Sequence, residues 1–346
     1  MIPSEQETIL NTTFPPAIAV QALNLVYNGD FLYFSNRIDP AIDMDFGHPD
    51  GWVYSDPRAG AKIGTSFTTF GCVILTGSGN GEMTLTQALH ELPRWRSMLL
   101  GKTVSAVVRL TVGASCEVAL SLSDGVSETR RSLITTTTPL TAEVGLQLPV
   151  DAAATGLFLS IRTSSPSVRL ELHQAFANTG DTAVEYAPCA VQGVIGERRQ
   201  YLATEYAPAE EISLCQPAAE LPADRSRLGS VLNGRFGRGA NERSMLPDMR
   251  GYFSRSWNNG ADVDPDAGQR QAWSGSSTTG DHVATLEPDM FAQHDHAYST
   301  FVSPPPPCQS GPGALSITAK QARTEPAGGN ETRPKNIAEL YTIKWA

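Results

Sequence analysis

The sequence predicts a mainly β protein, in which an N-terminal β-sandwich is followed by a loop-rich C-terminal module. Apolar and polar residues alternate with a period of two over much of the first half, as in half-buried strands. Glycine and proline recur between these runs, and charged residues make up only 18% of the chain. Many short alternating runs separated by turn residues are typical of a sandwich.

The charge balance excludes several classes of function. The chain of 346 residues carries 36 Asp plus Glu against 26 Lys plus Arg, a formal net charge of -10. A general binder of nucleic acid or of anionic membranes needs a basic surface instead. The five cysteines show no C-x-x-C spacing, which argues against a zinc finger. We see no apolar stretch long enough to span a membrane and no signal peptide at Met1.

We divide the chain into four parts. Residues 1–22 are polar and contain Pro15-Pro16, which indicates an attachment arm or a frayed terminus. Residues 23–187 hold the alternation that predicts the sandwich strands. The inward rows are expected to be Val118, Leu120, Leu122; Leu146, Leu148, Val150; Leu157, Leu159, Ile161; and Val168, Leu170, Leu172.

The second half is different in character. Residues 188–230 contain Pro208, Pro217 and Pro222 and are interpreted as a connector. Residues 231–346 are rich in Gly, Asn and Asp and have few apolar runs. Such a segment is too polar for a conventional monomeric core, so it is either loop-rich or stabilised by neighbouring chains.

One pair of histidines in this last part has the spacing of a metal site. Alternate residues of an extended strand point to the same side, so His294 and His296 can face one axis. Two histidines cannot fill a metal site, but three chains around a threefold axis supply six, which suits an octahedral transition-metal ion.

The C-terminal part resembles the collar and tip region of bacteriophage tail-fibre proteins. The strings that carry the resemblance run from Leu246-Pro247-Asp248-Met249-Arg250-Gly251-Tyr252-Phe253 through Trp257-Asn258-Asn259 and Val263-Asp264-Pro265 to Asp289-Met290-Phe291-Ala292-Gln293-His294-Asp295-His296 and Asn330-Glu331-Thr332-Arg333-Pro334-Lys335-Asn336. Two features depart from the family pattern: Ser256 stands where glycine is usual, and the run Pro304-Pro305-Pro306-Pro307 replaces a glycine-rich stretch. The tip loops are therefore expected to differ from those of relatives.

The resemblance implies an intertwined homotrimer on a virion tail, assembled in the host cytoplasm and contacting a bacterial receptor at its C-terminal tip. It implies that His294 and His296 of three chains hold a structural metal, with Fe(II) favoured. Zinc, nickel or copper can replace iron at such a site. Within the matched strings, Arg250 and Arg333 are candidates for the trimer interface. Tyr298 and Phe301, in the segment 291–313, are candidates for the receptor-contacting tip. Baseplate or other tail proteins are the expected partners of the N-terminus.

The N-terminal half resembles the carbohydrate-binding-module-like jelly-roll sandwich of phage tail proteins. Its matching strings include Asn28-Gly29-Asp30-Phe31 and Leu99-Leu100-Gly101-Lys102-Thr103-Val104-Ser105. Aromatic rings stack on the apolar face of sugars, which makes Trp52, Tyr54 and Trp95 the candidates for glycan contact. Sandwich cores also bury aromatic residues, so a structural role for each ring remains open.

These observations lead to an attachment protein that binds a bacterial surface, with glycan as the expected receptor and no enzymatic activity. A purely structural collar or baseplate component is the alternative. A polysaccharide depolymerase is a further one, because Asp262, Asp264 and Asp266 are crowded in one segment and glycoside hydrolysis needs paired carboxylates.

Overall fold

The computed structural model describes residues 22–35, 48–58, 62–66, 72–288, 299–300, 320–321 and 338–346. Its contacts divide the chain into two compact units. The first comprises residues 1–285 and 339–346, and the second comprises residues 286–338. Within the second unit the structure describes one antiparallel pair, β15 (Ser299–Thr300) and β16 (Lys320–Gln321). No helix in the described ranges is long and apolar enough to cross a membrane.

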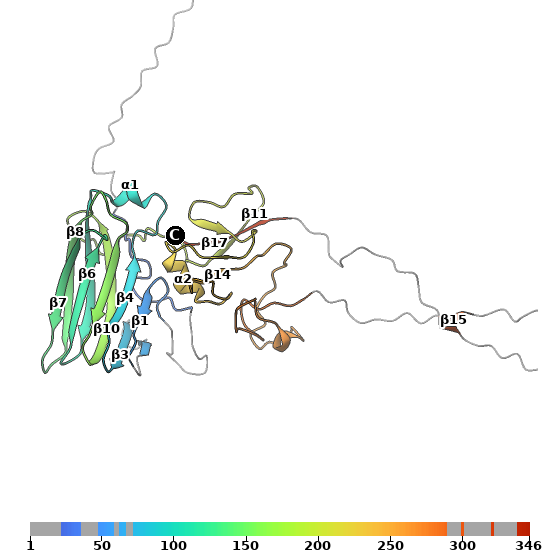
Figure 1. Ribbon diagram of the computed structural model, residues 1–346, viewed down its shortest axis with the longest axis horizontal. Helices are drawn as coiled ribbons and strands as arrows, with labels where there is room; N and C mark the ends of the chain where they lie inside the picture. Colours follow the sequence, from blue (N-terminus) through green and yellow to red (C-terminus); the bar gives the residue numbers. More distant parts are fainter. Residues whose placement is uncertain are drawn as a thin grey trace, which may run out of the picture. The chain divides into compact units, whose positions relative to one another are not determined.

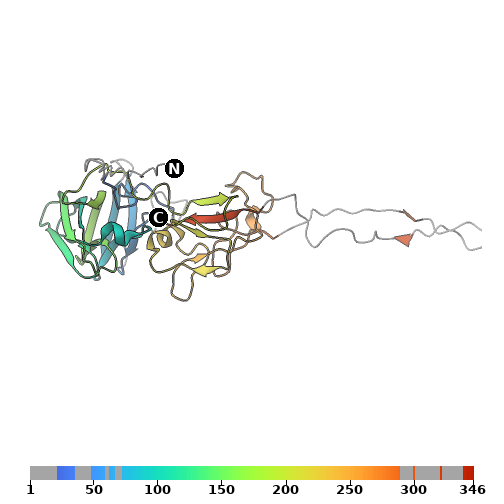
Figure 2. The same cartoon turned by 90° about the horizontal axis from the view of Figure 1, so that it is seen from above.

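The predicted β-sandwich is confirmed. One five-stranded sheet has the order β1 (Val53–Ser55), β4 (Met83–Ala88), β9 (Phe158–Thr163), β6 (Glu117–Ser123) and β7 (Glu128–Ile134). The other has the order β2 (Lys62–Ser66), β3 (Cys72–Ser78), β10 (Ser167–Thr179), β5 (Thr103–Val112) and β8 (Leu140–Pro149). All neighbours pair antiparallel, and the strands run alongside one another in both views (Figure 1, Figure 2).

The alternation that predicted the strands also determines the core. Every inward residue named from the sequence in the runs 118–122, 146–150, 157–161 and 168–172 is at most 5% exposed. The pattern continues in β5, where Val104, Val108 and Leu110 are buried between half-buried or polar neighbours. A bulge between Leu172 and Gln174 shifts the pairing of β10 with β5, so that Gln174 lies opposite Arg109.

Residues 188–230 are folded, contrary to their interpretation as a connector. They contain β11 (Arg198–Tyr201), β12 (Glu211–Ser213), β13 (Ala219–Glu220) and α2 (Ser226–Leu232). Strand β17 (Leu340–Lys344), near the C-terminus, lies between β11 and β12 in a three-stranded sheet. Pro208 separates β11 from β12, and both strands pair with β17, more than a hundred residues away, whereas β13 pairs with the nearer β14. The expected boundary at residue 231 therefore falls inside one compact unit.

A network of buried polar groups joins this second sheet region to the sandwich. The Glu91 carboxylate, between β4 and α1 (Trp95–Leu99), accepts hydrogen bonds from the Ser226 backbone N–H (2.6 Å), the Ser226 hydroxyl (2.6 Å) and the Arg227 backbone N–H (2.8 Å). Arg227 is fully buried and donates from Nη2 to the Leu25 carbonyl at 2.7 Å. Glu91 thus supplies the partner for the first N–H groups of α2.

Residues 247–288 follow β14 (Met245–Leu246) and form loops, as expected for this part of the chain. Their regular structure is a single turn of 3-10 helix, η2 (Ala267–Gln269). Large apolar side chains stay exposed here, among them Phe253 at 60%, Trp257 at 52% and Val263 at 79%. The segment therefore packs few of its apolar groups against its own chain. The predicted arm, residues 1–22, lies outside the described residues except for its last position.

Candidate functional site

Trp52 is a core residue, which contradicts its expected role in sugar contact. Its side chain is 0% exposed, and its ring packs on that of Phe31 with the centroids 5.2 Å apart. The preceding Gly51 adopts a positive φ of 84° and donates its N–H to the Ser230 hydroxyl at 2.7 Å. This turn directs the indole inward, so the ring offers no face to a ligand.

Tyr54 lies on β1 and is half-buried. Its hydroxyl donates to Asp56 Oδ2 at 3.2 Å, and burial, followed by the negative charge of Asp56, raises the pKa of Tyr54. Asp56 in turn pairs with Arg58 at 2.6 Å, and both side chains are fully buried. Tyr54 thus belongs to a local polar cluster that fixes the strand edge.

Trp95 lines a cavity, in contrast to Trp52. It is half-buried at the start of α1, with its ring edge-to-face against His90 at 5.2 Å between centroids. The cavity has a volume of about 340 Å³, and its walls include Trp95, His90, Arg225 and Trp345. Of the three aromatic candidates, Trp95 is the one placed where a ligand can reach it.

His90 lies in this wall, packed against Trp95 and Phe158. The Leu157 N–H donates to its Nδ1 at 3.1 Å, and burial lowers the pKa of His90 below its ordinary value. His48 is also buried enough that its pKa is lowered. Unfolded histidine binds a proton near pH 6.5, whereas these folded side chains resist it.

We expect the protein to lose stability as the pH falls from about 7 to about 5.5. The sign follows from the lowered pKa values: the unfolded chain takes up protons first, so the contribution is complete above about pH 6.5 and is lost as the pH approaches the folded values. Urea unfolding at a series of pH values measures this, and the His90→Asn variant should show a shallower loss. A wild-type stability that is constant or rises over this interval contradicts the assignment.

The outward face of β5, β8 and β10 carries a polar cluster that the sequence analysis did not single out. Arg109 donates to Glu185 Oε2 at 2.8 Å, to Glu143 Oε2 at 2.7 Å and to Gln174 Oε1 at 2.8 Å. Hydrogen bonding to Arg109 lowers the pKa of Glu185. The polar positions of the alternating pattern were the available signal, but the pattern does not show which of them meet across strands.

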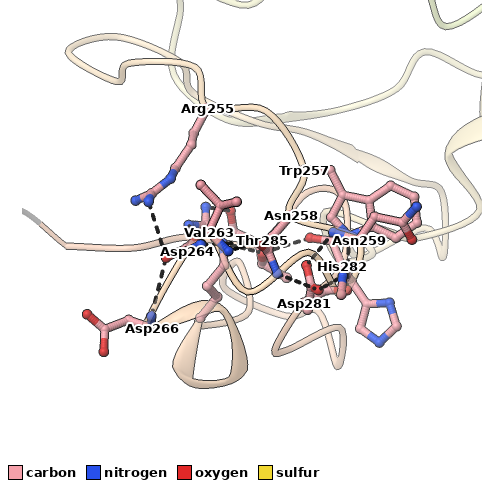
Figure 3. A network of polar contacts seen from close by, with 12 residues as sticks. Arg255, Trp257, Asn258, Asn259, Val263, Asp264, Asp266, Asp281, His282 and Thr285 are labelled. Carbon is pink, nitrogen blue, oxygen red and sulfur yellow. Dashed lines mark hydrogen bonds and ion pairs between the residues drawn. The ribbon is translucent and has the colours of Figure 1, made fainter.

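The loop segment 255–285 is organised around two aspartates (Figure 3). Asp281 accepts hydrogen bonds from the Gly260 N–H at 2.7 Å and from Asn258 Nδ2 at 3.2 Å, while the Asn258 amide oxygen accepts from the N–H groups of Val263 and Asp264, each at 3.0 Å. Trp257 donates its indole N–H to the Asp281 carbonyl at 3.1 Å. Trp257, Asn258, Val263 and Asp264 belong to the strings that carry the tail-fibre resemblance, whereas Gly260 and Asp281 lie outside them. Their polar contacts hold the loops in place.

Asp264 is structural in this network. It is 8% exposed and lies 3.3 Å from both Arg255 Nη2 and Arg270 Nη1. Its carboxylate is therefore engaged in two ion pairs within the loop network. The crowding of Asp262, Asp264 and Asp266 is thus explained in part by the loop fold.

No protein-family model matches the chain. It is 32% identical over 165 residues to protein RhiB of Rhizobium leguminosarum bv. viciae, a match that covers 46% of this chain and 74% of the relative. The chain belongs to the RhiB family.

The similarities of this RhiB-family chain to solved structures are weaker. A carbohydrate-binding module, TmCBM61 in complex with β-1,4-galactotriose, has a TM-score of 0.32 and 11% identity and covers 45% of this chain and 99% of its own. The enzymatically active domain of tailspike protein 4 from bacteriophage CBA120 has a TM-score of 0.33 and 13% identity. The match covers 46% of this chain and 22% of the tailspike chain. The CBM22-1 xylan-binding domain of Paenibacillus barcinonensis Xyn10C has a TM-score of 0.30 and 12% identity. The match covers 43% of this chain and 99% of the xylan-binding domain.

The remaining predicted site residues of this RhiB-family chain stay predictions. Arg250 is exposed and pairs with Asp248, with Nε 2.8 Å from Oδ1, which leaves its expected place at a subunit interface open. His294, His296, Tyr298, Phe301 and Arg333 lie outside the described residues. Within the described residues there is no group of three or more His, Cys, Asp or Glu side chains arranged to hold a metal.

Proposed function

We propose that this protein is a homotrimeric tail-fibre protein that attaches a phage or phage-like particle to a bacterial surface glycan. The observation that carries the proposal is the loop segment 246–288, which contains the first three of the five strings resembling tail-fibre collars. It is ordered by the Asn258 and Asp281 network yet leaves large apolar side chains in solvent.

The exposed apolar groups support association with further chains. Tyr252, Phe253, Trp257, Val263 and Val283 are between 43% and 79% exposed within one stretch of 32 residues (252–283). Water-exposed aromatic and β-branched residues in such number favour burial against a partner. A trimer in which three copies of the segment pack together removes them from solvent.

The proposed trimer also explains how the two histidines could bind a metal ion together. Two imidazoles per chain are too few for a transition-metal ion, whereas three chains supply the six nitrogen donors of an octahedral site. With every position taken by protein, the ion, which we propose to be Fe(II), has no open position for substrate and acts in structure. His294 and His296 are the residues that would hold it.

We expect the purified protein to have three times the mass of the chain and to contain one metal ion per trimer. Light scattering with elemental analysis measures both, on protein purified without chelator or a metal-affinity tag. The His294→Ala/His296→Ala double variant should bind no metal and should melt at a lower temperature. A metal-free wild-type trimer, or a double variant with unchanged melting, contradicts the metal site, and a monomeric mass contradicts the trimer.

The attachment role has its own test. Purified trimer should bind cells of the host bacterium and block adsorption of the particle that carries it. Protein that neither binds nor blocks indicates a purely structural collar or baseplate component. Release of reducing sugar from host capsule would indicate a depolymerase instead.

A further inference from the structure

We infer that the cavity between α1, the start of α2 and Trp345 binds a neutral terminal sugar of the receptor glycan, with Arg225 as its principal hydrogen-bond donor. The inference rests on the proposed glycan-binding function and assigns it a site. Part of this site lies outside the sandwich, because Arg225 and Trp345 come from the second sheet region.

The cavity has a size suited to a small ligand and is open to solvent. Its volume of about 340 Å³ lies near the lower end of the range for small-molecule sites, about 300–1,000 Å³. Arg94, Ala209 and Asp224 in its wall are exposed, so a ligand can enter from solvent. These dimensions suit the end of a glycan better than a long oligosaccharide lying along a groove.

Arg225 is fixed in position before any ligand arrives. Its guanidinium lies over the ring of Trp345, 3.5 Å from the ring centroid, and Trp345 is only 5% exposed. Nη1 of Arg225 lies 2.8 Å from both the carbonyl and a carboxylate oxygen of Asp224. A planar guanidinium held on an indole and paired on one nitrogen loses little freedom on binding.

The same guanidinium retains unused donors. Within the described residues the hydrogen bond and the ion pair of Arg225 both use Nη1, and Nε is shielded from solvent, so the donors available to a ligand are those of Nη2. The two N–H groups of Nη2 can each donate to one of two neighbouring oxygens. Vicinal hydroxyls of a sugar present such a pair, and the exposed carboxylate of Asp224 can accept from a third hydroxyl.

The rest of the wall fits the other properties of a sugar. Trp95, Leu92 and Pro93 provide apolar surface for the C–H face of a pyranose. His90, whose Nδ1 lies 3.1 Å from the Leu157 nitrogen and 3.3 Å from the Leu157 carbonyl oxygen, has a second ring nitrogen, Nε2, as a further polar atom. The site thus combines an apolar wall with fixed polar groups, as ligand sites commonly do.

The charges in the wall favour a neutral ligand. Arg94 and Arg225 are balanced by Glu91 and Asp224. The Glu91 carboxylate is already occupied by three donors at the start of α2. The chain as a whole carries a net charge of -10, which further disfavours an acidic sugar.

The test measures the affinity of the full-length protein and its variants for a panel of neutral and acidic bacterial-surface oligosaccharides, followed by calorimetry on the strongest neutral binder. We expect Arg225→Gln to weaken binding about tenfold or more, because the fixed donors are lost. Ala209→Trp, which narrows the cavity from an exposed position, should weaken binding to a similar degree. Circular dichroism and melting temperature verify that each variant is folded.

Arg109→Gln is the matched control, since it removes a guanidinium from the polar face of the sandwich. Its affinity should equal that of the wild type. If Arg109→Gln weakens binding while Arg225→Gln and Ala209→Trp do not, the sugar binds on the sheet face and the cavity assignment is wrong. A clear preference for acidic sugars overturns the proposed ligand class. A wild-type protein that binds no glycan overturns the glycan part of the proposed function as well.

Discussion

Replacing Glu91 by alanine is expected to destabilise the protein by about 3–5 kcal/mol, as when one partner is removed from a buried charged network. Glu91 is 2% exposed, and its carboxylate accepts three hydrogen bonds from the start of α2. Alanine leaves those donors without partners and withdraws the negative charge that favours the buried guanidinium of Arg227. Urea unfolding at a fixed protein concentration measures the change.

The buried arginine provides a way to separate the causes of this loss. If an uncompensated guanidinium contributes, the Glu91→Ala/Arg227→Met double variant should be less destabilised than the sum of the single variants. Glu82→Ala, at an exposed position of the same sandwich, should stay within about 0.5 kcal/mol of the wild type. A Glu91→Ala variant as stable as Glu82→Ala would show that this network does not hold the sandwich and α2 together.

The sandwich could be predicted from the sequence because its signal is local. Val118, Leu120 and Leu122 occupy alternate positions of one strand, and their burial follows from that spacing alone. Strands β11 and β12 carry no comparable signal, since they span four and three residues. They are stabilised by pairing with β17, which lies more than a hundred residues further along the chain. No local pattern encodes such a pairing.

The candidate site could not be predicted from the sequence for the same reason. Helix α2 depends on Glu91, which lies 135 residues before Ser226. Trp95 and Trp345 line one cavity although 250 positions separate them. A sequence shows which aromatic residues are present, but only the fold decides which of them face solvent. Trp52 illustrates the point, since Phe31 and the turn at Gly51 determine its burial.

Replacing Trp52 by alanine is accordingly expected to cost about 3–5 kcal/mol of folding free energy, the range for removing a large aromatic side chain from a core. The fully buried indole contacts Phe31 and donates its N–H to the Asn28 carbonyl at 3.4 Å. Alanine removes both contacts and leaves a cavity under β1. Urea unfolding of the variant at the protein concentration used for the wild type measures the loss.

Two further variants separate the core role of Trp52 from a role in binding. Trp52→Phe keeps most of the apolar contact and should lose less stability than Trp52→Ala. Tyr206→Ala, at an aromatic residue that is 83% exposed, should be close to neutral. Molecules of Trp52→Ala that remain folded should bind glycan as the wild type does, because the ring has no access to ligand. Unchanged stability together with lost glycan affinity would instead require Trp52 to leave the core, contrary to its contacts with Phe31 and Asn28.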